Sequence, residues 1–582
     1  MTHPTRRSFL TTMAAMGGSA TLAACGGSNY TPAQFRYGVA SGDPLATSVI
    51  LWTHAKRPNL EGDVYLNWQV ASDATFNSIV SSGNVIATIA AGNTAKVDAT
   101  GLAPDNTYFY RFGDESGVYS AVGTTRTLPS ASASSVKFAV FSCTLYSAGF
   151  FNVYDSAVNS GAQFAIHLGD YIYEYGSDPA KFGNTVVSDP ANPATSTTTA
   201  VGLGRVVTPA NDIVSLNDYR TRYAQYRLDA NLQALHAKMP WITIWDDHEF
   251  ANNAYMDGAQ NHDPLTQGTW TARKAVAAQA YHEWMPIRTP DVSNLLKIYR
   301  KFDFGTLFSL HMLDTRIEGR TKQVYGYYGD PFDAHVQPYA WADYAAGLTP
   351  VSGVYPDAAN KMISNTQFNW LTGNIATATT TWQIIGNQDI MAKLWYPQSV
   401  VAAFANGPAA FSTAVGTYLA GPRTEFKIPI NMDSWDGYAI QRETLLQTIK
   451  ATGKKLVVLS GDSHNAWFNN LKSLDGTSQI GVEFATTSVT APGYESAGLG
   501  GLASTIDGSS PSIANTNGTG FGLLSDVNYS DTIRRGYLLM TVTAANVKGE
   551  FVFVDNIKTK SYAASVGKTV TVAASNLAVS YS

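Results

Sequence analysis

Hydrophobic and polar positions follow two different patterns along this chain of 582 residues. From Phe35 to about Arg126, short runs rich in β-branched and aromatic residues alternate with turn residues such as Gly42-Asp43-Pro44. Runs of this kind predict short strands bounded by turns, here Val49–Trp52, Val64–Val70 and Thr107–Phe112. An all-β stretch of about 90 residues is typical of an immunoglobulin-like or fibronectin-type sandwich. We therefore expect a small β-sandwich domain over residues 34–128.

After Val136 the pattern changes to short apolar runs that alternate with amphipathic stretches. Near-continuous apolar runs are typical of strands covered on both faces, and strands that alternate with helices indicate a layered α/β domain. The predicted strands are Val136–Phe141, Ala162–Leu168, Trp241–Trp245, Leu307–Leu313, Trp382–Ile385, Leu456–Leu459, Gly536–Val542 and Gly549–Val554. The predicted helices are Phe150–Val158, Tyr219–Met239, Ala272–Trp284 and Ile440–Lys450. We expect this second domain to cover residues 135–582, with surface insertions at Ser188–Leu203 and Gly498–Gly522.

Polar side chains follow six of these predicted strands, at the point where each strand ends. The segments are Ser142-Cys143-Thr144, Gly169-Asp170-Tyr171-Ile172-Tyr173, Asp246-Asp247-His248-Glu249, Asp314-Thr315-Arg316, Gly386-Asn387-Gln388-Asp389 and Gly461-Asp462-Ser463-His464. Ligand sites in α/β sheets lie beyond the carboxyl ends of the strands, so these segments predict a metal site. Taken singly, Asp170 is compatible with an ordinary turn and Cys143 with a buried apolar position. Three acids around His248, directly after a buried run, would be costly without cations to pair with.

The first residues carry two export signals. Arg6-Arg7 lies in a twin-arginine context, and the weakly apolar stretch Thr11–Ala24 is too short and too mild for a transmembrane helix. Leu22-Ala23-Ala24-Cys25-Gly26 resembles the lipobox of bacterial lipoproteins, which implies cleavage before Cys25 and acylation of its sulfur. We expect residues 1–24 to be a signal peptide and the protein to be periplasmic or on the cell surface, with a lipid anchor in the membrane. The alternative is an Ala-rich N-terminus that matches both signals by chance.

The composition narrows the function without defining it. With 39 basic and 44 acidic residues the formal net charge is -5, which argues against a nucleic-acid binder because such proteins need a basic face. The net charge does not exclude a small phosphate substrate, because a binding site can be locally positive whatever the total charge. The two cysteines each have a separate explanation, so we expect no disulfide. Most of the ten histidines lie outside the polar segments, so the predicted site is rich in carboxylate and suits a hard cation such as calcium better than zinc.

Several of these segments together resemble one known family. Gly169-Asp170-x-x-Tyr173, Trp245-Asp246-Asp247-His248-Glu249 with Asn252-Asn253, and Gly461-Asp462-Ser463-His464 resemble the motifs of PhoD-like alkaline phosphatases, which belong to the calcineurin-like metallophosphoesterases. The resemblance covers nearly the whole mature chain in order. It implies a four-layer α/β/β/α metallophosphoesterase sandwich behind the small all-β domain. It also implies hydrolysis of phosphate monoesters through a dinuclear metal centre.

The resemblance implies a ligand for each position of that centre. Asp170 would bridge the two metals. The residues implied for the first metal, expected to be ferric iron, are Cys143, Tyr173 and His464. The residues implied for the second, expected to be calcium, are Asp247, Asp462 and the carboxamide of Asn387 or Gln388. The ligand types agree, because a phenolate with a thiolate suits iron, whereas carboxylates and carboxamides suit calcium.

The expected chemistry is attack of a metal-activated water on phosphorus, without a covalent enzyme intermediate. His248 is the candidate to protonate the leaving oxygen or orient the phosphate, and its alternative role is to brace a metal ligand. Arg316 is the first candidate to clamp the phosphate, because a guanidinium matches two oxygens. Arg220 and Arg288 are the next candidates for this role. A structural salt bridge is the alternative role for each arginine.

Two other functions fit parts of the sequence. The same metal core serves phosphodiesterases and phospholipase D-like enzymes, whose substrates carry a second substituent on the phosphate. A surface lipoprotein with a structural metal and a binding β-sandwich is a third possibility, although structural sites do not keep an open position. The natural substrate, the membrane leaflet and the oligomeric state are not fixed by any of these patterns.

Overall fold

The computed structural model of the protein describes residues 31–131, 133–177, 200–322, 360–397, 399–400, 403, 408–421, 427–429, 431–473, 475–497, 500–507, 524 and 526–582. The predicted signal peptide and the lipobox with Cys25 lie outside the described residues, as does most of both predicted insertions. Among the helices that the structure describes, none combines the length and the apolar character that crossing a membrane requires.

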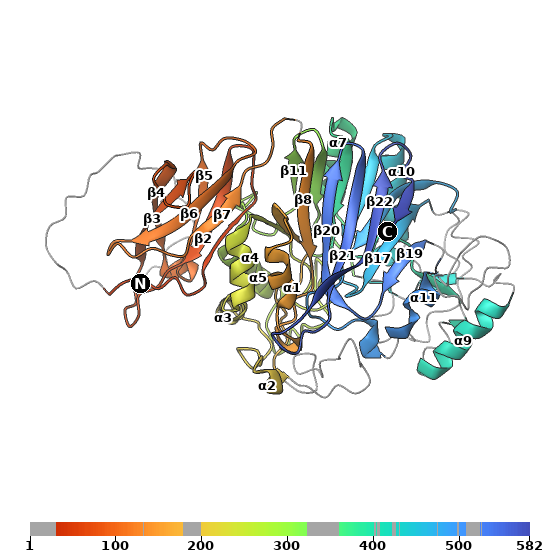
Figure 1. The fold of residues 1–582 in the computed structure, drawn as a ribbon. Helices are drawn as coiled ribbons and strands as arrows, with labels where there is room; N and C mark the ends of the chain where they lie inside the picture. The colour runs from red at the N-terminus through yellow and green to blue at the C-terminus, as the bar shows by residue number, and fades with distance from the viewer. Residues whose placement is uncertain are drawn as a thin grey trace.

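Two large sheets carry the fold (Figure 1). The ten strands of the first sheet, in spatial order, are β23 (Val579–Tyr581), β22 (Ala564–Ala573), β21 (Asn546–Val554), β20 (Arg535–Thr543), β8 (Ser135–Phe141), β9 (Phe164–His167), β10 (Trp241–Thr243), β1 (Val39–Gly42), β2 (Ser48–His54) and β5 (Thr94–Thr100). The seven strands of the second are β11 (Arg300–Phe304), β12 (Phe308–Met312), β13 (Trp382–Gly386), β16 (Lys455–Ser460), β18 (Gln479–Ala485), β17 (Ala466–Lys472) and β19 (Val527–Asp531). A separate pair joins β14 (Trp395–Pro397) to β15 (Lys427–Pro429).

The N-terminal region is all-β, as predicted, and forms a lobe at one end of the molecule (Figure 1). A four-stranded sheet encloses the core of this lobe together with β1, β2 and β5, and its strands are β4 (Ile79–Ala87), β3 (Val64–Ala71), β6 (Thr107–Asp114) and β7 (Gly123–Arg126). The lobe is not separate from the rest, because β1 pairs in parallel with β10 through Gly42 and Trp241. A Cβ atom on Gly42 would lie 2.2 Å from the carbonyl oxygen of Pro286, so this close approach requires glycine.

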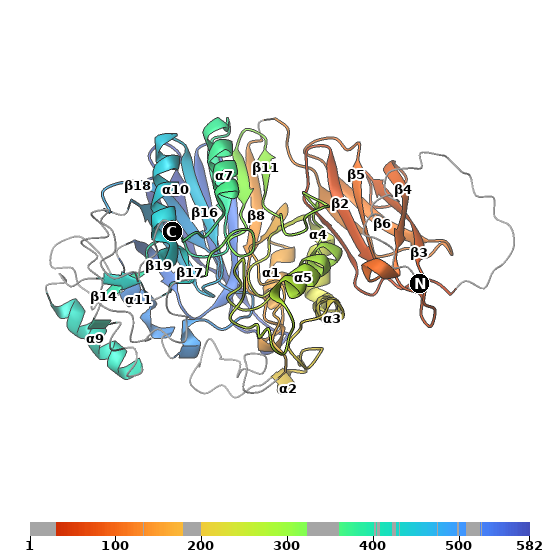
Figure 2. The same cartoon turned by 180° about the vertical axis from the view of Figure 1, so that it is seen from behind.

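The longer helices pack on different parts of the two sheets. The largest apolar core contains residues from both sheets and from α1 (Asn152–Val158), α3 (Leu216–Tyr226), α4 (Ala230–Lys238) and α5 (Trp270–Trp284). A second core joins the seven-stranded sheet to α7 (Asn365–Thr377) and α10 (Ala439–Ala451), which lie in front of that sheet in Figure 2. The other described α-helices are α2 (Ala200–Leu203), α9 (Pro408–Ala420) and α11 (Ala503–Ile506).

The six predicted strands that end in polar segments are confirmed, and they run in two parallel sets. In the first sheet β8, β9 and β10 are parallel neighbours. In the second sheet β12, β13 and β16 are parallel neighbours. Parallel strands place their carboxyl ends at the same edge of a sheet, so the polar segments of each set emerge together.

The amphipathic stretch Tyr219–Met239 is helical, as its pattern predicts, but it is interrupted. The stretch forms two helices, α3 and α4, with a break at Arg227–Asp229. The Asp229 carboxylate accepts hydrogen bonds from the backbone N–H groups of Asn231 and Leu232, which is the N-cap interaction that begins a new helix.

Candidate metal centre

Four of the predicted ligands share an uncommon backbone conformation. Cys143, Asp170, Asp462 and His464 have φ between 55° and 61°, and Asn253 has a φ of 53°. Non-glycine residues seldom adopt this left-handed conformation, and it concentrates at sites where the surrounding structure holds a strained turn for function. Each of the four lies directly after a parallel strand: Cys143 after β8, Asp170 after β9, and Asp462 and His464 after β16. The left-handed turns bend these side chains toward one another.

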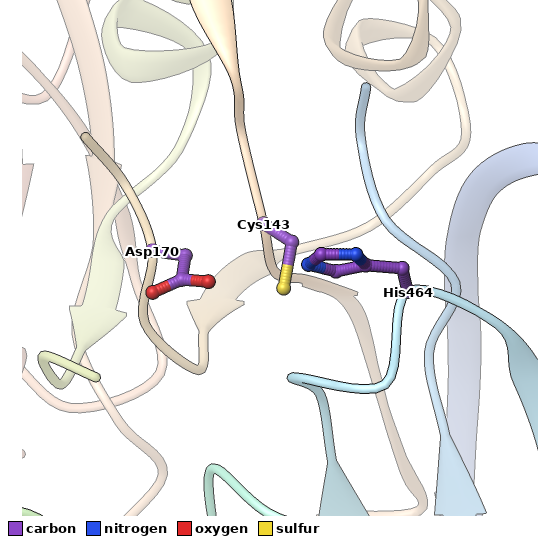
Figure 3. A group of neighbouring side chains, drawn as sticks. All are labelled: Cys143, Asp170 and His464. Atoms are coloured by element: carbon purple, nitrogen blue, oxygen red, sulfur yellow. The ribbon is translucent and has the colours of Figure 1, made fainter. Parts of the chain in front are cut away.

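The first group of ligand atoms comes from three separate loops. The sulfur of Cys143, a carboxylate oxygen of Asp170 and a ring nitrogen of His464 all lie within 4.8 Å of one another, and Figure 3 shows Cys143 between the other two. The Tyr173 hydroxyl joins them, because it donates to Asp170 Oδ2 at 2.9 Å and lies 3.3 Å from His464 Nε2. The structure thus brings together all four residues predicted around the first metal.

The imidazole of His464 is held by a hydrogen bond at its Nδ1, the ring nitrogen that does not face the ligand group. Its Nδ1 lies 2.6 Å from the carbonyl oxygen of Pro492, so Nδ1 carries the proton and donates it. Burial lowers the pKa of His464 to about 4, so the ring is neutral at pH 7 and its Nε2 lone pair faces the group. A neutral imidazole held by its other nitrogen is the usual form of a metal-binding histidine.

A second group of acids adjoins the first. Carboxylate oxygens of Asp246, Asp247 and Asp462 lie within 4.8 Å of one another, and ligand atoms of Asp170, Asp247 and His248 do so as well. Within the described part of the chain, Asp247 Oδ1 is buried and has no hydrogen-bond partner, whereas its Oδ2 accepts from the backbone N–H of Asn253 at 2.5 Å. A buried carboxylate oxygen without a donor fits a cation as its missing partner.

The acids of these groups oppose one another electrostatically. Burial and the neighbouring carboxylates together raise the pKa of Asp170 and Asp462 well above the usual range, although His248 and Arg316 respectively act in the other direction. Burial also raises the pKa of the Cys143 thiol and the Tyr173 phenol, and Asp170 adds to the increase. Groups that are buried next to like charges become fully ionised only when cations compensate them. The side chains present therefore fit a site for two cations.

Glu249 braces the loops of the centre, a role that the sequence patterns did not reveal. Its carboxylate accepts from the backbone N–H groups of Asp170 at 3.0 Å, Tyr171 at 2.5 Å and Asp246 at 2.8 Å. Burial raises the pKa of Glu249 to about 7. One side chain thereby ties the loop after β9 to the loop after β10. The only signal in the sequence was its place in the acid-rich segment after β10.

His248 has a carboxylate partner of its own. Its Nδ1 donates to Glu174 Oε2 at 2.6 Å, and Glu174 Oε1 accepts from the backbone N–H of Asn252 at 2.7 Å. Although burial lowers the pKa of His248, the carboxylates of Asp247, Asp170 and Glu174 raise it well above its usual value. The ring lies 4.1 Å from that of Tyr173, measured between centroids, and His248 is 7% exposed. These carboxylates therefore favour the protonated imidazole, and the ring borders both groups of ligands.

Arg316 pairs with acids in this structure. Its guanidinium is 0% exposed and contacts four carboxylates, which belong to Asp246, Asp389, Asp433 and Asp462. All of its nitrogens are engaged by these partners. In this structure the charge of Arg316 compensates these acids, and its role as a phosphate ligand stays a prediction.

The two secondary arginine candidates also have structural partners. Arg220 donates to Glu283 at 2.7 Å and to the carbonyl oxygen of Ala90 at 2.6 Å. Arg288 pairs with Asp98 of β5 and donates to Ser48 Oγ of β2 at 2.8 Å. Both therefore connect the N-terminal lobe to the second domain, and the prediction that they clamp phosphate is not supported.

The carboxamides after β13 are likewise engaged elsewhere. Asn387 Oδ1 accepts from the indole N–H of Trp435 at 2.9 Å, and its Nδ2 donates to the carbonyl oxygen of Asp389. Gln388 Oε1 accepts from the Thr315 hydroxyl at 2.6 Å, and its Nε2 donates to backbone carbonyl groups. In this structure the polar atoms of both side chains hold neighbouring loops together, and Asn387 or Gln388 as a ligand of the second metal stays a prediction.

The chain is similar to known proteins over both of its regions. A family model described as PhoD-like phosphatase matches residues 138–551, and one described as PhoD-like phosphatase, N-terminal domain, matches residues 20–129. Alkaline phosphatase D of Bacillus subtilis (strain 168) is 34% identical over 481 residues, which represent 80% of this chain and 71% of that protein. A solved structure of PhoD superposes with a TM-score of 0.71 at 27% identity, covering 96% of this chain and 93% of that one.

Proposed function

The chain belongs to the PhoD-like phosphatase family and is a hydrolase of phosphoric esters, and from this membership we propose that it releases phosphate from organic monoesters at a dinuclear metal centre. The observation that carries the proposal is the unpartnered, buried Oδ1 of Asp247 beside carboxylates whose pKa values are raised. Such a set of acids needs cations to be ionised, and phosphoryl transfer needs cations beside the phosphate.

We assign the ligands from the two groups of side chains. The residues proposed for the first metal, with Asp170 as the bridge to the second, are Cys143, Tyr173 and His464. The residues proposed for the second metal are Asp247 and Asp462. We add Asn253 as a second carboxamide candidate beside Asn387, because its backbone N–H donates to Asp247 Oδ2. The side-chain nitrogen of Asn253 donates to Gln260 at 3.2 Å, so its carbonyl oxygen is the atom available to a cation.

The ligand chemistry suggests which metals bind. A thiolate, a phenolate and an imidazole suit ferric iron at the first position, and oxygen ligands suit calcium at the second. When bound, the two cations would lower the pKa of a water molecule and neutralise charge on the transferred phosphoryl group. The two central sheets, with helices outside them, are proposed to form the four-layer scaffold that holds this centre.

His248 is the chain's own group that we propose to move a proton. Its ring borders the ligands Asp170 and Asp247, and Glu174 holds its Nδ1, so Nε2 is the atom that serves the substrate. A cationic imidazole there donates a hydrogen bond to the phosphate or a proton to the leaving oxygen. Glu174 keeps the ring charged and fixes its direction.

We further propose that the protein acts outside the cytoplasm as a lipoprotein. The support is the order of the twin-arginine pair and the lipobox at Cys25. Export of the folded protein agrees with a metal centre that contributes to folding stability. The Cys25→Ser variant is expected to leave the membrane fraction after export. Membrane association equal to that of the wild type would contradict the anchor.

The ratio of initial rates on p-nitrophenyl phosphate and bis-p-nitrophenyl phosphate tests the activity. We expect the protein exported with its metals to favour the monoester. A ratio that favours the diester would replace the proposal with a phosphodiesterase on the same centre. The Asp247→Ala variant is expected to lose one metal equivalent and nearly all turnover, and the matched control is Asp257→Asn, which changes an exposed acid. Full activity of Asp247→Ala would remove this residue from the centre.

A further inference from the structure

Arg227, at the C-terminal cap of helix α3, is a buried cation that lacks acceptors for most of its N–H groups. The residue is 1% exposed. The Tyr171 hydroxyl interacts with its guanidinium, but within the described residues no acceptor meets hydrogen-bond geometry at Nε, Nη1 or Nη2. A guanidinium has five N–H donors, and burying such donors unpaired is among the most unfavourable arrangements in a protein interior. An acceptor is therefore missing from this position.

One aromatic ring compensates the charge only in part. The Arg227 guanidinium carbon lies 4.2 Å from the ring centroid of Trp52, which belongs to β2 of the N-terminal lobe. This cation–π contact uses the face of the guanidinium. Its N–H bonds point outward in the plane of the group, so the ring does not satisfy them.

The groups that act electrostatically on Arg227 do not include a carboxylate among the described residues. Burial lowers its pKa, and the opposing influences come from the hydroxyls of Tyr171 and Tyr110. Both of these are phenols, whose ordinary pKa is about 10, so they carry no negative charge at neutral pH. The cation of Arg227 therefore has no counter-charge from these neighbours.

Another buried arginine in the same region shows the contrast. Arg205 is 4% exposed and also lies over an aromatic ring, at 3.8 Å from the centroid of Tyr146. Unlike Arg227, it pairs with a carboxylate, at 2.9 Å from Asp229, and it donates to a backbone carbonyl. The fold thus gives the buried Arg205 a carboxylate partner, whereas the described residues provide none for the buried Arg227.

We propose that Arg227 binds a small monovalent inorganic anion of halide size, located between the N-terminal lobe and the domain that carries the metal centre. The buried hydroxyls of Ser41 and Tyr110 interact with each other and have no further partner in the described structure, and Tyr110 also lies close enough to act on Arg227. The Tyr171 hydroxyl pairs with His236 Nε2 at 2.9 Å. Burial lowers the pKa of His236 well below its usual value, so this neighbour stays neutral and supplies no competing charge.

The position gives the anion a structural consequence. Trp52 lies in the N-terminal lobe, and Tyr171 directly follows the proposed bridging ligand Asp170. An anion at Arg227 therefore stabilises the contact between the lobe and the loop that carries Asp170. A ligand that binds only the folded state raises the unfolding temperature. The inference does not depend on the phosphatase proposal, because the anion is neither substrate nor product.

Bromide anomalous scattering tests the site directly on the unmodified protein. Crystals of the metal-loaded mature protein grown or soaked in sodium bromide are expected to show an anomalous peak within hydrogen-bonding distance of the Arg227 guanidinium. A site filled by water alone, with no bromide peak there, would overturn the proposal. This measurement needs no variant, so it holds even where a substitution at this buried position prevents folding.

Thermal unfolding at constant ionic strength gives a second, independent readout. Replacing gluconate by chloride is expected to raise the unfolding temperature of the wild type by about 2 °C or more. Arg227→Met should abolish this chloride dependence, whereas Arg205→Met should retain it. The same dependence in Arg227→Met as in the wild type, or none in the wild type, would contradict an anion at Arg227.

Discussion

At the residue scale, the surroundings give two neighbouring acids opposite properties. Although burial raises the pKa of Asp247, the charges of His248 and Arg316 lower it to about 2. Burial raises the pKa of Glu249 to about 7, even though three backbone N–H groups bond to it. Divergent pKa values of adjacent acids often mark different roles in a site. Asp247 stays ionised and offers an oxygen to a cation, whereas Glu249 holds backbone.

The His248→Gln variant tests whether His248 donates a proton or only supports a metal ligand. We expect it to retain its metals and to lose about 10²–10⁴-fold in kcat, the usual contribution of a positioned acid or base. Metal analysis and steady-state kinetics are the measurements. Glu174→Gln keeps the His248 imidazole but removes the charge of its carboxylate partner, so a smaller loss of kcat is expected.

A matched control for His248 is His262→Gln, because His262 lies on Trp270 and outside both groups of ligands. It should keep the wild-type kcat. Unchanged turnover in His248→Gln would remove this histidine from catalysis. Loss of metal in that variant would instead identify it as a brace for Asp247.

The Arg316→Met variant is expected to affect stability more than substrate binding. Methionine removes the cation that pairs with Asp246, Asp389 and Asp433, and only the last two keep Arg320 as a partner. Breaking buried ion pairs in this way typically costs about 3–5 kcal/mol. The free energy of unfolding in denaturant measures this loss. A rise in KM with unchanged stability would support Arg316 as a phosphate ligand.

At the element scale, the loop after β18 holds the imidazole of the first metal group. Pro492 accepts from His464 Nδ1, and the next residue, Gly493, donates its backbone N–H to Glu495 at 3.0 Å. Glu495 is buried and paired with Arg535 at the start of β20. The ion pair thus anchors this loop to the ten-stranded sheet while the loop orients a ligand of the seven-stranded one.

The Glu495→Gln variant tests this positioning role. Loss of the ion pair should loosen the loop and reduce affinity for the first metal by about 10–100-fold, as is usual for groups that orient a ligand. Metal titration of the folded apoprotein measures the effect. The control is Glu550→Gln, which alters a half-buried pair with Lys548 on the neighbouring hairpin, away from the ligand groups. Equal affinity in both variants would exclude the proposed role of Glu495.

The strands of the centre could be predicted because each has a clear local signal. Runs such as Trp241–Trp245 are continuously apolar and end in charged residues, and burial on both faces produces that pattern. The helix α7 was missed because its sequence, Asn365–Thr377, is rich in Asn and Thr, which favour helices weakly, although Phe368, Leu371 and Ile375 recur at helical spacing. The break between α3 and α4 was missed because a single capping residue, Asp229, outweighs the periodicity around it.

The candidate site was predicted less evenly than the strands. Cys143, Asp170 and His464 follow strand ends, so the rule for α/β sheets placed them together. Asn387 also follows a strand end, but its side-chain oxygen accepts a hydrogen bond from Trp435. Arg316 follows another strand end, and its guanidinium pairs with buried acids. The rule locates a residue at an edge of a sheet, whereas the direction of its side chain depends on partners from distant segments.

At the scale of the whole molecule, one glycine joins two regions that the sequence presents as separate domains. The register Gly42↔Trp241 makes β1 a neighbour of β10, and the lobe's β2 and β5 continue from it. Local patterns contain no information on which distant strand is paired, so the extension of the sheet was not foreseen. This continuity connects the N-terminal lobe directly to the strand that precedes Asp246 and Asp247.

The acids of the centre also set how the whole protein responds to pH without metal. In the metal-free form, burial and repulsion raise the pKa of Asp170, Asp246 and Asp462. The ordinary aspartate pKa in an unfolded chain is about 3.9, so above about pH 4 the folded state holds more protons than the unfolded state. Its stability then falls as pH rises toward and past neutrality.

Cations remove this penalty, because they compensate the ionised acids and bind only the folded state. We therefore expect the unfolding temperature of chelated protein to fall between about pH 5 and pH 8, while that of metal-loaded protein changes much less. Calorimetry of both forms across this range, with metal restored after chelation as the control, is the measurement. The gap between the two forms must widen as pH rises, because the folded acids lose their protons over this range. A gap that is constant with pH, or larger at pH 5, would contradict a centre built from buried acids that need cations.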